Sequence, residues 1–297
     1  MMIATAVCRR LLVFFKEAPR SGTVHSVFDH AVNLEFEERE GLAGLIAKPK
    51  AFTPYAVSVR TEIPFSQAGV RAGMAAVAAD GRIIISQAGL EIDCLDASSV
   101  DLSLDSISIS PAAQRSAQAE ILDWVLAEAD AGESLAPLAT GAGETVYTRF
   151  LAPRFSALEK ALCEEDEKAS TEAAERFAGC GPGLTPSSDD LLCGFLAVMR
   201  LLAREQKREN LPNLIARTAI AAAKKTNRIS ATFLLQCGEG LVNEPVLDLL
   251  TQIFQNSEPD RIRHAAKRVL EIGSTSGADM LTGIALALRQ RMGGNEH

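Results

Sequence analysis

Hydrophobic and polar positions follow two different rhythms along this chain. Over the first third, Val, Ile and small residues alternate with polar residues in short runs, which is the two-residue period of strands. These runs are broken by Gly, Pro and Asp-Gly and predict strands at 22–36, 55–65, 73–79, 82–88 and 100–109. Asp80-Gly81, between two of the runs, is a strong hairpin signal. We therefore expect a small antiparallel β-rich domain over residues 1–110.

The rhythm changes at Ser110-Pro111, where a serine can cap a helix whose first residue is proline. From there, apolar residues recur at helical spacing and predict helices at 112–130, 146–163, 166–178, 187–206, 211–225, 230–240, 244–256, 258–271 and 276–291. The sole tryptophan, Trp124, falls on an apolar helix face and is interpreted as a core residue. Strands segregated from helices indicate the α+β class, with a larger all-helical domain over residues 111–297.

Composition narrows the class of protein. Of the 297 residues, 47% are hydrophobic and 23% are charged, which is typical of a globular protein. The net charge of −8 argues against nucleic acid as a partner, and no apolar run reaches the roughly 20 residues of a membrane span. The six cysteines form no CxxC pair, and the four histidines lack zinc-site spacing. We therefore predict a cytoplasmic protein with reduced thiols, no bound metal and no cofactor.

The most informative segment is GCGPGLTPSSDDLLCG, from Gly179 to Gly194. Three glycines in five residues let the backbone turn tightly and approach a ligand closely. A helix start rich in hydroxyls and carboxylates follows, and its exposed N–H groups and positive dipole end favour an anion. The segment is not a Walker loop, because it lacks the lysine, nor a Rossmann fingerprint, because no strand precedes it.

A second segment, GSTSGADMLTG from Gly273 to Gly283, has a similar pattern. Residues 187–194 align without gaps on residues 276–283, so that Ser, Asp, Leu and Gly recur in register. Ser-x-x-Asp is the spacing of a capping box, in which both side chains satisfy backbone donors at a helix start. Gly194 and Gly283 would let a neighbouring helix come close. We expect the two helix starts to converge on one cavity.

Two interpretations of the aspartates remain open. Asp190 and Asp279 are expected to bond backbone N–H groups, and they could do no more than cap their helices. Asp189 is expected to be the freer carboxylate, because a cap needs only one. Lys224-Lys225-Thr226-Asn227-Arg228-Ile229-Ser230 lies between the segments and either complements a helix C-terminus or helps to hold an anionic substrate. Covalent catalysis by Cys180 or Cys193 is weakly supported, because no histidine is nearby in sequence.

The two segments together resemble the AllH-type subunit of oxamate carbamoyltransferase. The resemblance extends from about residue 22 to residue 288, and its Pro-Gly-Leu-Thr-Pro-Ser core is the most specific part. Ser188 stands where the family's loop is expected to carry Gly. The resemblance implies one subunit of a three-subunit enzyme of anaerobic allantoin breakdown, which exchanges a carbamoyl group between oxalurate and phosphate. It also implies an anionic substrate, other subunits as partners and a homo- or hetero-oligomer.

Two other functions remain open. One is a magnesium-dependent hydrolase resembling the ADP-ribosylglycohydrolases, in which the aspartates hold the metal. The other is a non-catalytic scaffold or ligand-sensing subunit. The catalytic candidates are Asp189 and Asp190. The substrate-binding candidates lie in or beside the helix starts: Gly181, Gly183, Leu184, Thr185, Ser187, Ser188, Thr226, Arg228, Ser230, Ser274, Ser276, Gly277 and Asp279.

Overall fold

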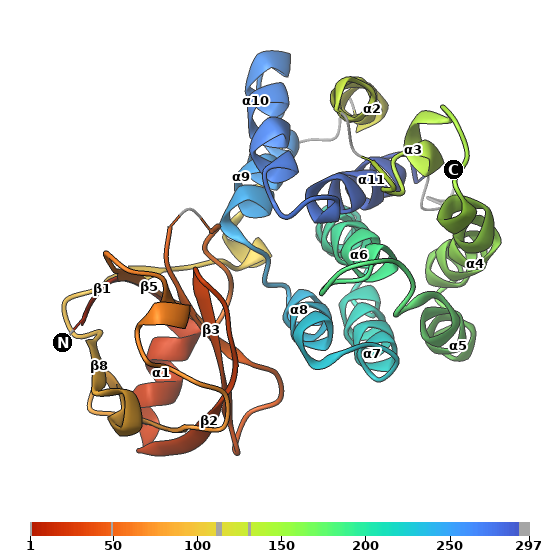
Figure 1. The fold of residues 1–297 in the computed structure, drawn as a ribbon. Coiled ribbons are helices and arrows are strands. Elements are labelled where there is room, and N and C mark those ends of the chain that lie inside the picture. Colours follow the sequence, from red (N-terminus) through yellow and green to blue (C-terminus); the bar gives the residue numbers. More distant parts are fainter. Residues whose placement is uncertain (1, 49, 111–114, 130–131, 291–297) are drawn as a thin grey trace. The chain divides into compact units, whose positions relative to one another are not determined.

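The computed structural model describes residues 2–48, 50–110, 115–129 and 132–290. The chain divides into two compact units, Met1–Leu102 and Ser103–His297 (Figure 1). The first unit carries the strands and the second carries almost only helices, which confirms the α+β class.

The first unit is a closed barrel. Its strands are β1 Met2–Cys8, β2 Arg20–Val27, β3 Ala31–Phe36, β4 Ala43–Ile46, β5 Ala56–Arg60, β6 Ala75–Ala79, β7 Arg82–Ile85, β8 Leu90–Asp93 and β9 Ser98–Val100. The sheet order is β5-β4-β3-β2-β6-β7-β8-β1-β9, and pairing of β1 with β5 closes a ring of eight strands. The prediction of an antiparallel sheet was wrong, because β4–β5, β1–β8 and β1–β9 are parallel pairs. Alternation specifies which residues form strands, but it does not specify the neighbour with which each strand pairs.

The hairpin that the sequence predicts in the barrel agrees with the structure better than the predicted strand pairing does. Asp80 and Gly81 have φ angles of 50° and 73° and join β6 to β7, which confirms the predicted hairpin. Helix α1, Arg9–Glu17, packs on the strands through buried Leu11 and Phe15. The ring of Phe15 lies 5.8 Å from that of Phe36 in β3. Strands β1, β4 and β8 were not predicted. The predicted strand at 100–109 was wrong, because β9 ends at Val100 and a 3-10 turn occupies Leu104–Ser106.

The second unit contains ten described helices. They are α2 Arg115–Glu128, α3 Pro137–Thr140, α4 Val146–Cys163, α5 Glu167–Phe177, α6 Ser187–Glu205, α7 Leu211–Ala223, α8 Arg228–Gly238, α9 Glu244–Phe254, α10 Pro259–Leu270 and α11 Ser276–Leu288. Every regular element described after residue 110 is a helix, as predicted. Only the short α3 was missed, and Pro111 lies outside the described residues. Helix α6 is the centre of this unit, since it is buried along most of its length and contacts α7, α8 and α11 (Figure 1).

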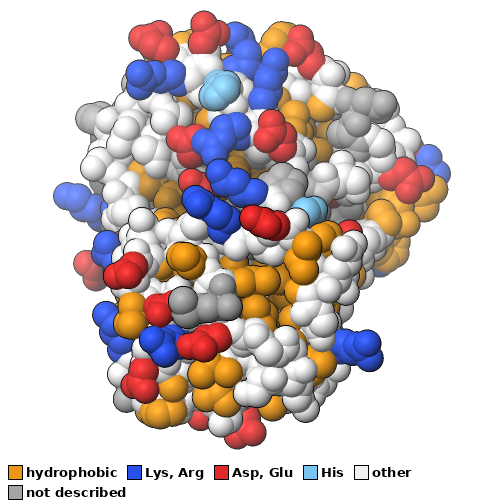
Figure 2. Space-filling view, turned by 60° about the vertical axis from the view of Figure 1, so that its left-hand side comes forward, with side chains coloured by type: hydrophobic (Ala, Val, Ile, Leu, Met, Phe, Trp, Pro, Cys, Tyr) orange, Lys and Arg blue, Asp and Glu red, His pale blue; other side chains and the backbone are white. Residues whose placement is uncertain are grey.

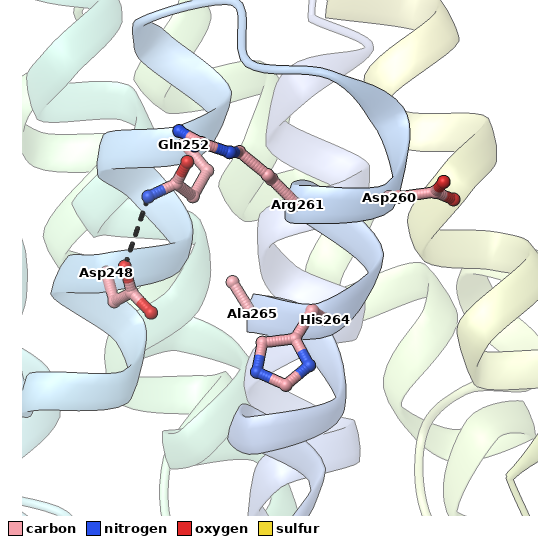
Figure 3. A pocket seen from close by; sticks show the side chains of 6 residues that line it. All are labelled: Asp248, Gln252, Asp260, Arg261, His264 and Ala265. Carbon is pink, nitrogen blue, oxygen red and sulfur yellow. Dashed lines mark hydrogen bonds between the residues drawn. The ribbon is translucent and has the colours of Figure 1, made fainter.

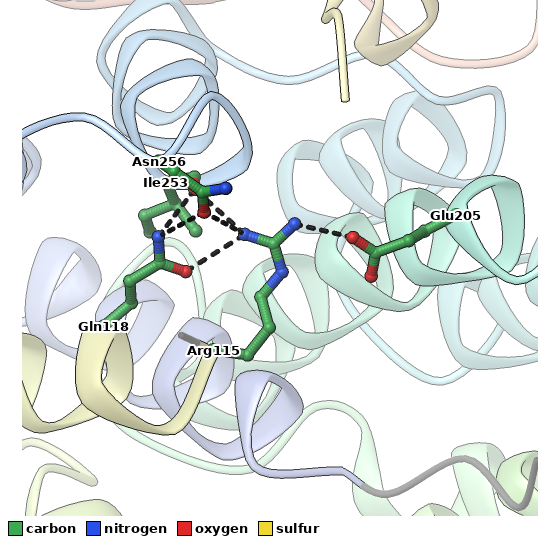
Figure 4. Close-up of polar contacts among 5 residues, drawn as sticks. All are labelled: Arg115, Gln118, Glu205, Ile253 and Asn256. Atoms are coloured by element: carbon green, nitrogen blue, oxygen red, sulfur yellow. Dashed lines mark hydrogen bonds and ion pairs between the residues drawn. The ribbon is translucent and has the colours of Figure 1, made fainter. Parts of the chain in front are cut away.

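A polar network fixes the start of α2 to the ends of two other helices (Figure 4). The guanidinium of Arg115 donates to the carbonyl oxygen of Ile253 at 2.9 Å and pairs with Glu205 at 2.7 Å. Gln118, one turn further along α2, donates to the same carbonyl at 2.8 Å. Both members of the ion pair are largely shielded from water, with side chains 10% and 13% exposed. The network therefore joins α2 to the ends of α6 and α9.

Trp124 does not belong to the core, so its sequence interpretation was wrong. Its side chain is 43% exposed, and the Arg263 guanidinium lies 4.5 Å from its ring centroid. Lys267, one turn further along α10, lies 5.7 Å from the same ring. An indole tolerates a half-exposed position when a cation covers its face, and helical periodicity does not reveal such a partner.

The surface carries both signs of charge. On the face drawn in Figure 2, Lys and Arg side chains lie among Asp and Glu side chains. Within the described residues, no helix combines the length and apolar character needed to cross a membrane.

Candidate functional site

The loop between α5 and α6 is shaped by three glycines with positive φ. Gly179, Gly181 and Gly183 have φ angles of 77°, 124° and 94°, which other residues rarely adopt. A Cβ at Gly179 would overlap the carbonyl oxygen of Lys225, and one at Gly181 would lie 2.5 Å from the Ser187 nitrogen. The close approach predicted for a ligand is therefore made, at these two positions, by the protein's own backbone. Gly183 alone faces open space, with its nearest neighbour at 3.9 Å.

Asp189 binds this loop to the start of α8. Its Oδ1 accepts the N–H of Gly179 at 2.7 Å, and its Oδ2 accepts the hydroxyls of Thr226 at 2.5 Å and Ser230 at 2.7 Å. The side chain is buried. The prediction that Asp189 is the freer carboxylate was wrong, because Gly179, Thr226 and Ser230 all donate to it. Its geometry suits a positioning role better than contact with a ligand.

Ser188 makes a second connection between the loop and α6. Its hydroxyl accepts the N–H of Cys180 at 2.9 Å, and its own N–H donates to the Cys180 carbonyl at 3.0 Å. A glycine at this position would lack the first of these bonds. The serine therefore holds the loop more closely on the helix start than glycine could.

The starts of α6 and α11 lie side by side, as expected from their similar sequences, while the cavity that they were expected to share stays a prediction. The hydroxyls of Thr185 and Ser276 are 2.9 Å apart, and Thr185 also donates to Asp190 at 2.8 Å. Further along, a Cβ at Gly194 would overlap the carbonyl oxygen of Met280 in α11, and one at Gly283 would overlap that of Leu191 in α6. The glycines at matching positions thus allow close backbone contact, and both helices present their N-terminal ends to one junction.

The aspartates of this junction do not form capping boxes. The N-cap residues are Pro186 and Thr275, so each serine is the first helical residue, one position too late to cap. The junction carboxylates find other partners. Asp279 accepts a backbone N–H, but that of Leu135, at 2.6 Å, which precedes α3 and belongs to neither helix. Asp279 therefore bonds a backbone N–H as expected, although not one of its own helix. Asp190 accepts the side-chain hydroxyl of Thr185 instead, so the expected cap was wrong there.

Burial has the largest effect on the pKa values of the two junction carboxyl groups, those of Asp190 and Asp279. Loss of solvent raises the pKa of Asp190 well above its ordinary value, against hydrogen bonds from Ser276 and Thr185 that lower it. It raises the pKa of Asp279 to about 7, against the Leu135 N–H and the Ser187 hydroxyl. These two carboxyl groups therefore carry protons at a pH where exposed aspartates are ionised.

Two buried polar atoms of the junction lack a hydrogen-bond partner among the described residues. They are Oγ of Ser187 and Oδ2 of Asp279, both on fully buried side chains. The Ser187 hydroxyl faces the Asp279 carboxyl and lowers its pKa. The two groups do not meet the distance and angle of a full hydrogen bond. A buried polar atom without a partner costs about 1–3 kcal/mol, so these two neighbouring groups are polar capacity that the described residues leave unused.

The remaining sequence candidates fall into two sets. Thr185, Thr226, Ser230 and Ser276 belong to the hydrogen-bonded cluster around the aspartates. Other candidates lie at its edge: Leu184 is 58% exposed, and Ser274 and Arg228 are exposed. Gly277 serves packing, because a Cβ there would overlap the carbonyl oxygen of Val269.

The sequence analysis missed Arg154 of α4. Burial raises the pKa of the Cys180 thiol, and the Arg154 guanidinium, which stacks on Phe150, lowers it in part. No pattern in the sequence connects these two residues, because packing of α4 on α5 and α6 brings them together.

A separate hollow of about 340 Å³ lies between α9 and α10 (Figure 3). Arg268 pairs with Asp248 on its wall at 2.9 Å, and Gln252 donates to the same carboxylate at 3.3 Å. It shares no lining residue with the helix-start junction. Its lining residues are Asp248, Gln252, Asp260, Arg261, His264 and Ala265.

The metal-dependent alternative finds little support in this geometry. Across residues 2–48, 50–110, 115–129 and 132–290, no three His, Cys, Asp or Glu side chains are grouped as metal ligands. Both oxygens of Asp189 are occupied by protein donors. The cysteines also offer little chemistry, since the Cys237 thiol and burial raise the pKa of the Cys193 thiol, and burial raises that of the Cys180 thiol.

Comparison with protein families agrees with this layout. The family model described as oxamate carbamoyltransferase subunit AllH matches residues 177–288, which contain the glycine loop and both helix starts. The model of the AllH family N-terminal domain matches residues 3–99, which form the barrel. No solved structure matches the chain significantly. The two family matches together cover most of the chain, which therefore belongs to the AllH family of oxamate carbamoyltransferase subunits.

Proposed function

We propose that this chain binds the oxyanion substrates of a carbamoyl transfer between oxalurate and phosphate, at the junction of α6 and α11. In that reaction a phosphate oxygen attacks the ureido carbonyl carbon of oxalurate. The bond from this carbon to the nitrogen of the oxamate moiety breaks, and that nitrogen takes the proton of hydrogen phosphate. The products are carbamoyl phosphate and oxamate, and charge and protons balance.

The observation that carries the proposal is the pair of helix starts joined by Thr185 and Ser276. Each N-terminus has the equivalent of about half a positive charge, and two in contact repel each other unless negative charge lies between them. The junction carboxylates supply part of that charge, and a bound anion would supply more. The orphaned atoms of Ser187 and Asp279 add a hydroxyl and a carboxyl oxygen that lack protein partners among the described residues.

The same groups suit a carbamoyl or amide end of the substrate. An ionised Asp279 accepts N–H donors, and a protonated one donates to a carbonyl oxygen. Because its pKa is about 7, both forms are present near neutral pH. Burial also raises the pKa of Asp190 well above its ordinary value, which reduces its repulsion toward an anion. Transfer of this kind needs mainly positioning and electrostatic stabilisation, which hydroxyls and backbone donors provide.

Thermal unfolding of the purified chain, alone and with the partner subunits that its family implies, tests the proposal. Phosphate, carbamoyl phosphate, oxamate and Mg²⁺ are the probes, because a ligand that binds only the folded state raises its stability. We expect a rise with phosphate or oxamate in the absence of Mg²⁺. A rise with Mg²⁺ alone would favour the hydrolase. No rise with any probe, for the chain or the assembled complex, would favour a scaffold.

A further inference from the structure

The hollow between α9 and α10 has side chains of both helices on its walls (Figure 3). Its volume of about 340 Å³ lies within the roughly 300–1,000 Å³ that is typical of sites for small molecules. Arg261, His264 and Ala265 share one face of α10, because residues three and four apart are neighbours on a helix surface. The buried methyl group of Ala265 leaves open the space that a larger side chain would fill.

Both carboxylates of the hollow are already neutralised by the protein. Asp248 accepts from Gln252 at 3.3 Å through one oxygen and pairs with Arg268 at 2.9 Å through the other. Asp260 pairs with Arg263 at 2.6 Å, and Figure 3 shows it pointing away from the hollow. The hollow therefore offers a cation no carboxylate that lacks a partner.

The two basic side chains of the hollow have no such partners. Among residues 115–129 and 132–290, no acidic or hydrogen-bonding group contacts the side chain of Arg261 or that of His264. Arg261 extends from α10 toward Gln252 of α9, and His264 follows one turn further along α10 (Figure 3). A guanidinium has five N–H donors, and an imidazole donates at least one N–H in either protonation state. The positive charge of Arg261 is therefore unbalanced here, in a chain with a net charge of −8.

We infer that this hollow binds a small ligand through a phosphate or carboxylate group, which Arg261 and His264 hold. A guanidinium matches two oxygens of either group with two parallel N–H bonds. The imidazole N–H supplies a further donor from the same helix face. The site shares no lining residue with the α6–α11 junction, so the inference does not depend on the proposed function.

The imidazole resonance of His264 tests the inference directly, in the full chain labelled with ¹³C at histidine. The chain has four histidines, and the signal that is absent in His264→Gln is that of His264. Inorganic phosphate and oxamate are the probes, and sodium chloride at equal ionic strength corrects for screening of surface charges. We expect at least one probe to shift the signal to saturation, with no saturating shift in chloride.

Arg261→Gln removes the charge of the site and leaves the His264 reporter in place. Arg149→Gln is the matched control, because it makes the same change of net charge at an exposed arginine of α4. The Arg261 side chain is exposed, so both variants should fold like the wild type. We expect the dissociation constant from the His264 shift to rise at least about fivefold in Arg261→Gln, less in Arg261→Lys and not at all in Arg149→Gln.

The outcomes separate this inference from the proposed function. Saturation with phosphate alone assigns a phosphate group to the hollow, and saturation with oxamate alone assigns a carboxylate. A shift that only follows ionic strength, or equal dissociation constants for Arg261→Gln and Arg149→Gln, would overturn the inference. If the probes raise the melting temperature but leave His264 unmoved, the inference fails while the proposed function stands.

Discussion

Replacing Asp279 by Asn should change how the stability of the helical unit depends on pH. Asp279 is fully buried, and its pKa is about 7 in the folded protein, compared with about 3.9 for an unfolded aspartate. Between these values the folded state retains a proton that the unfolded state releases. The stabilising contribution is therefore complete below about pH 4 and is lost as the pH rises through about 7. A gap of about three pH units corresponds to about 4 kcal/mol.

The asparagine side chain should remove this pH-dependent loss of stability and keep the contacts of the site. The variant Asp279→Asn keeps an oxygen for the Leu135 N–H and presents an N–H group where the carboxyl has an orphaned oxygen. Trp124 is the only tryptophan, so its fluorescence reports unfolding of the helical unit in urea. Between pH 5 and pH 9, the free energy of unfolding of the variant should rise by about 2–4 kcal/mol relative to that of the wild type.

The matched control is Asp260→Asn, since the Asp260 side chain is 92% exposed. Its pH profile should run parallel to that of the wild type. Asp190 is present in every protein compared, so its contribution largely cancels in the difference. If Asp279→Asn has the same pH dependence as the wild type, the buried carboxyl is already ionised at pH 5 and the reasoning is refuted.

Three further substitutions test the packing and polar contacts of the helical unit. Gly283→Ala places a methyl group on the Leu191 carbonyl, so we expect a loss of about 1–3 kcal/mol in urea unfolding; an unchanged midpoint would contradict the close helix contact. Arg115→Ala leaves Glu205 without its shielded partner and should cost about 3 kcal/mol, whereas a cost under about 1 kcal/mol would mark the network as incidental. Asp189→Asn loses an acceptor among several donors and should lower the melting temperature, contrary to the sequence expectation; equal melting temperatures would restore Asp189 as a free carboxylate.

Helical periodicity predicted the second unit well because its helices are long and amphipathic. Helix α4 begins and ends at the predicted residues 146 and 163, and α6 begins at Ser187 as predicted. The barrel was less predictable. The range 22–36 holds two strands with a turn between them, and the closing pair of β1 with β5 joins segments far apart in sequence. Such pairings depend on tertiary packing, which a single sequence does not display.

The site was predictable in its location but not in its bonding. Repetition of Ser, Asp and Gly was enough to predict that two helix starts meet. The hydrogen-bond partners of those side chains belong to other segments, which the two motifs do not reveal. Asp279 accepts from Leu135, and Asp189 accepts from the start of α8. The packing of Phe155 against Phe177 and Phe195 likewise has no local signature in the sequence, because it joins three different helices.

The central claim is that the junction of α6 and α11 binds a substrate oxyanion. Ser187 and Ser170 both have fully buried hydroxyls without a described partner, but only Ser187 lies in the junction. Ser170→Ala is the control for Ser187→Ala because both remove a fully buried hydroxyl, whereas only Ser187 faces the Asp279 carboxyl and lowers its pKa. The deciding measurement is the dissociation constant of oxamate, and of phosphate, for the assembled complex of each variant by titration calorimetry. We expect binding about three- to tenfold weaker for Ser187→Ala and unchanged for Ser170→Ala. Equal affinities in both variants and the wild type, for both probes, would contradict the claim.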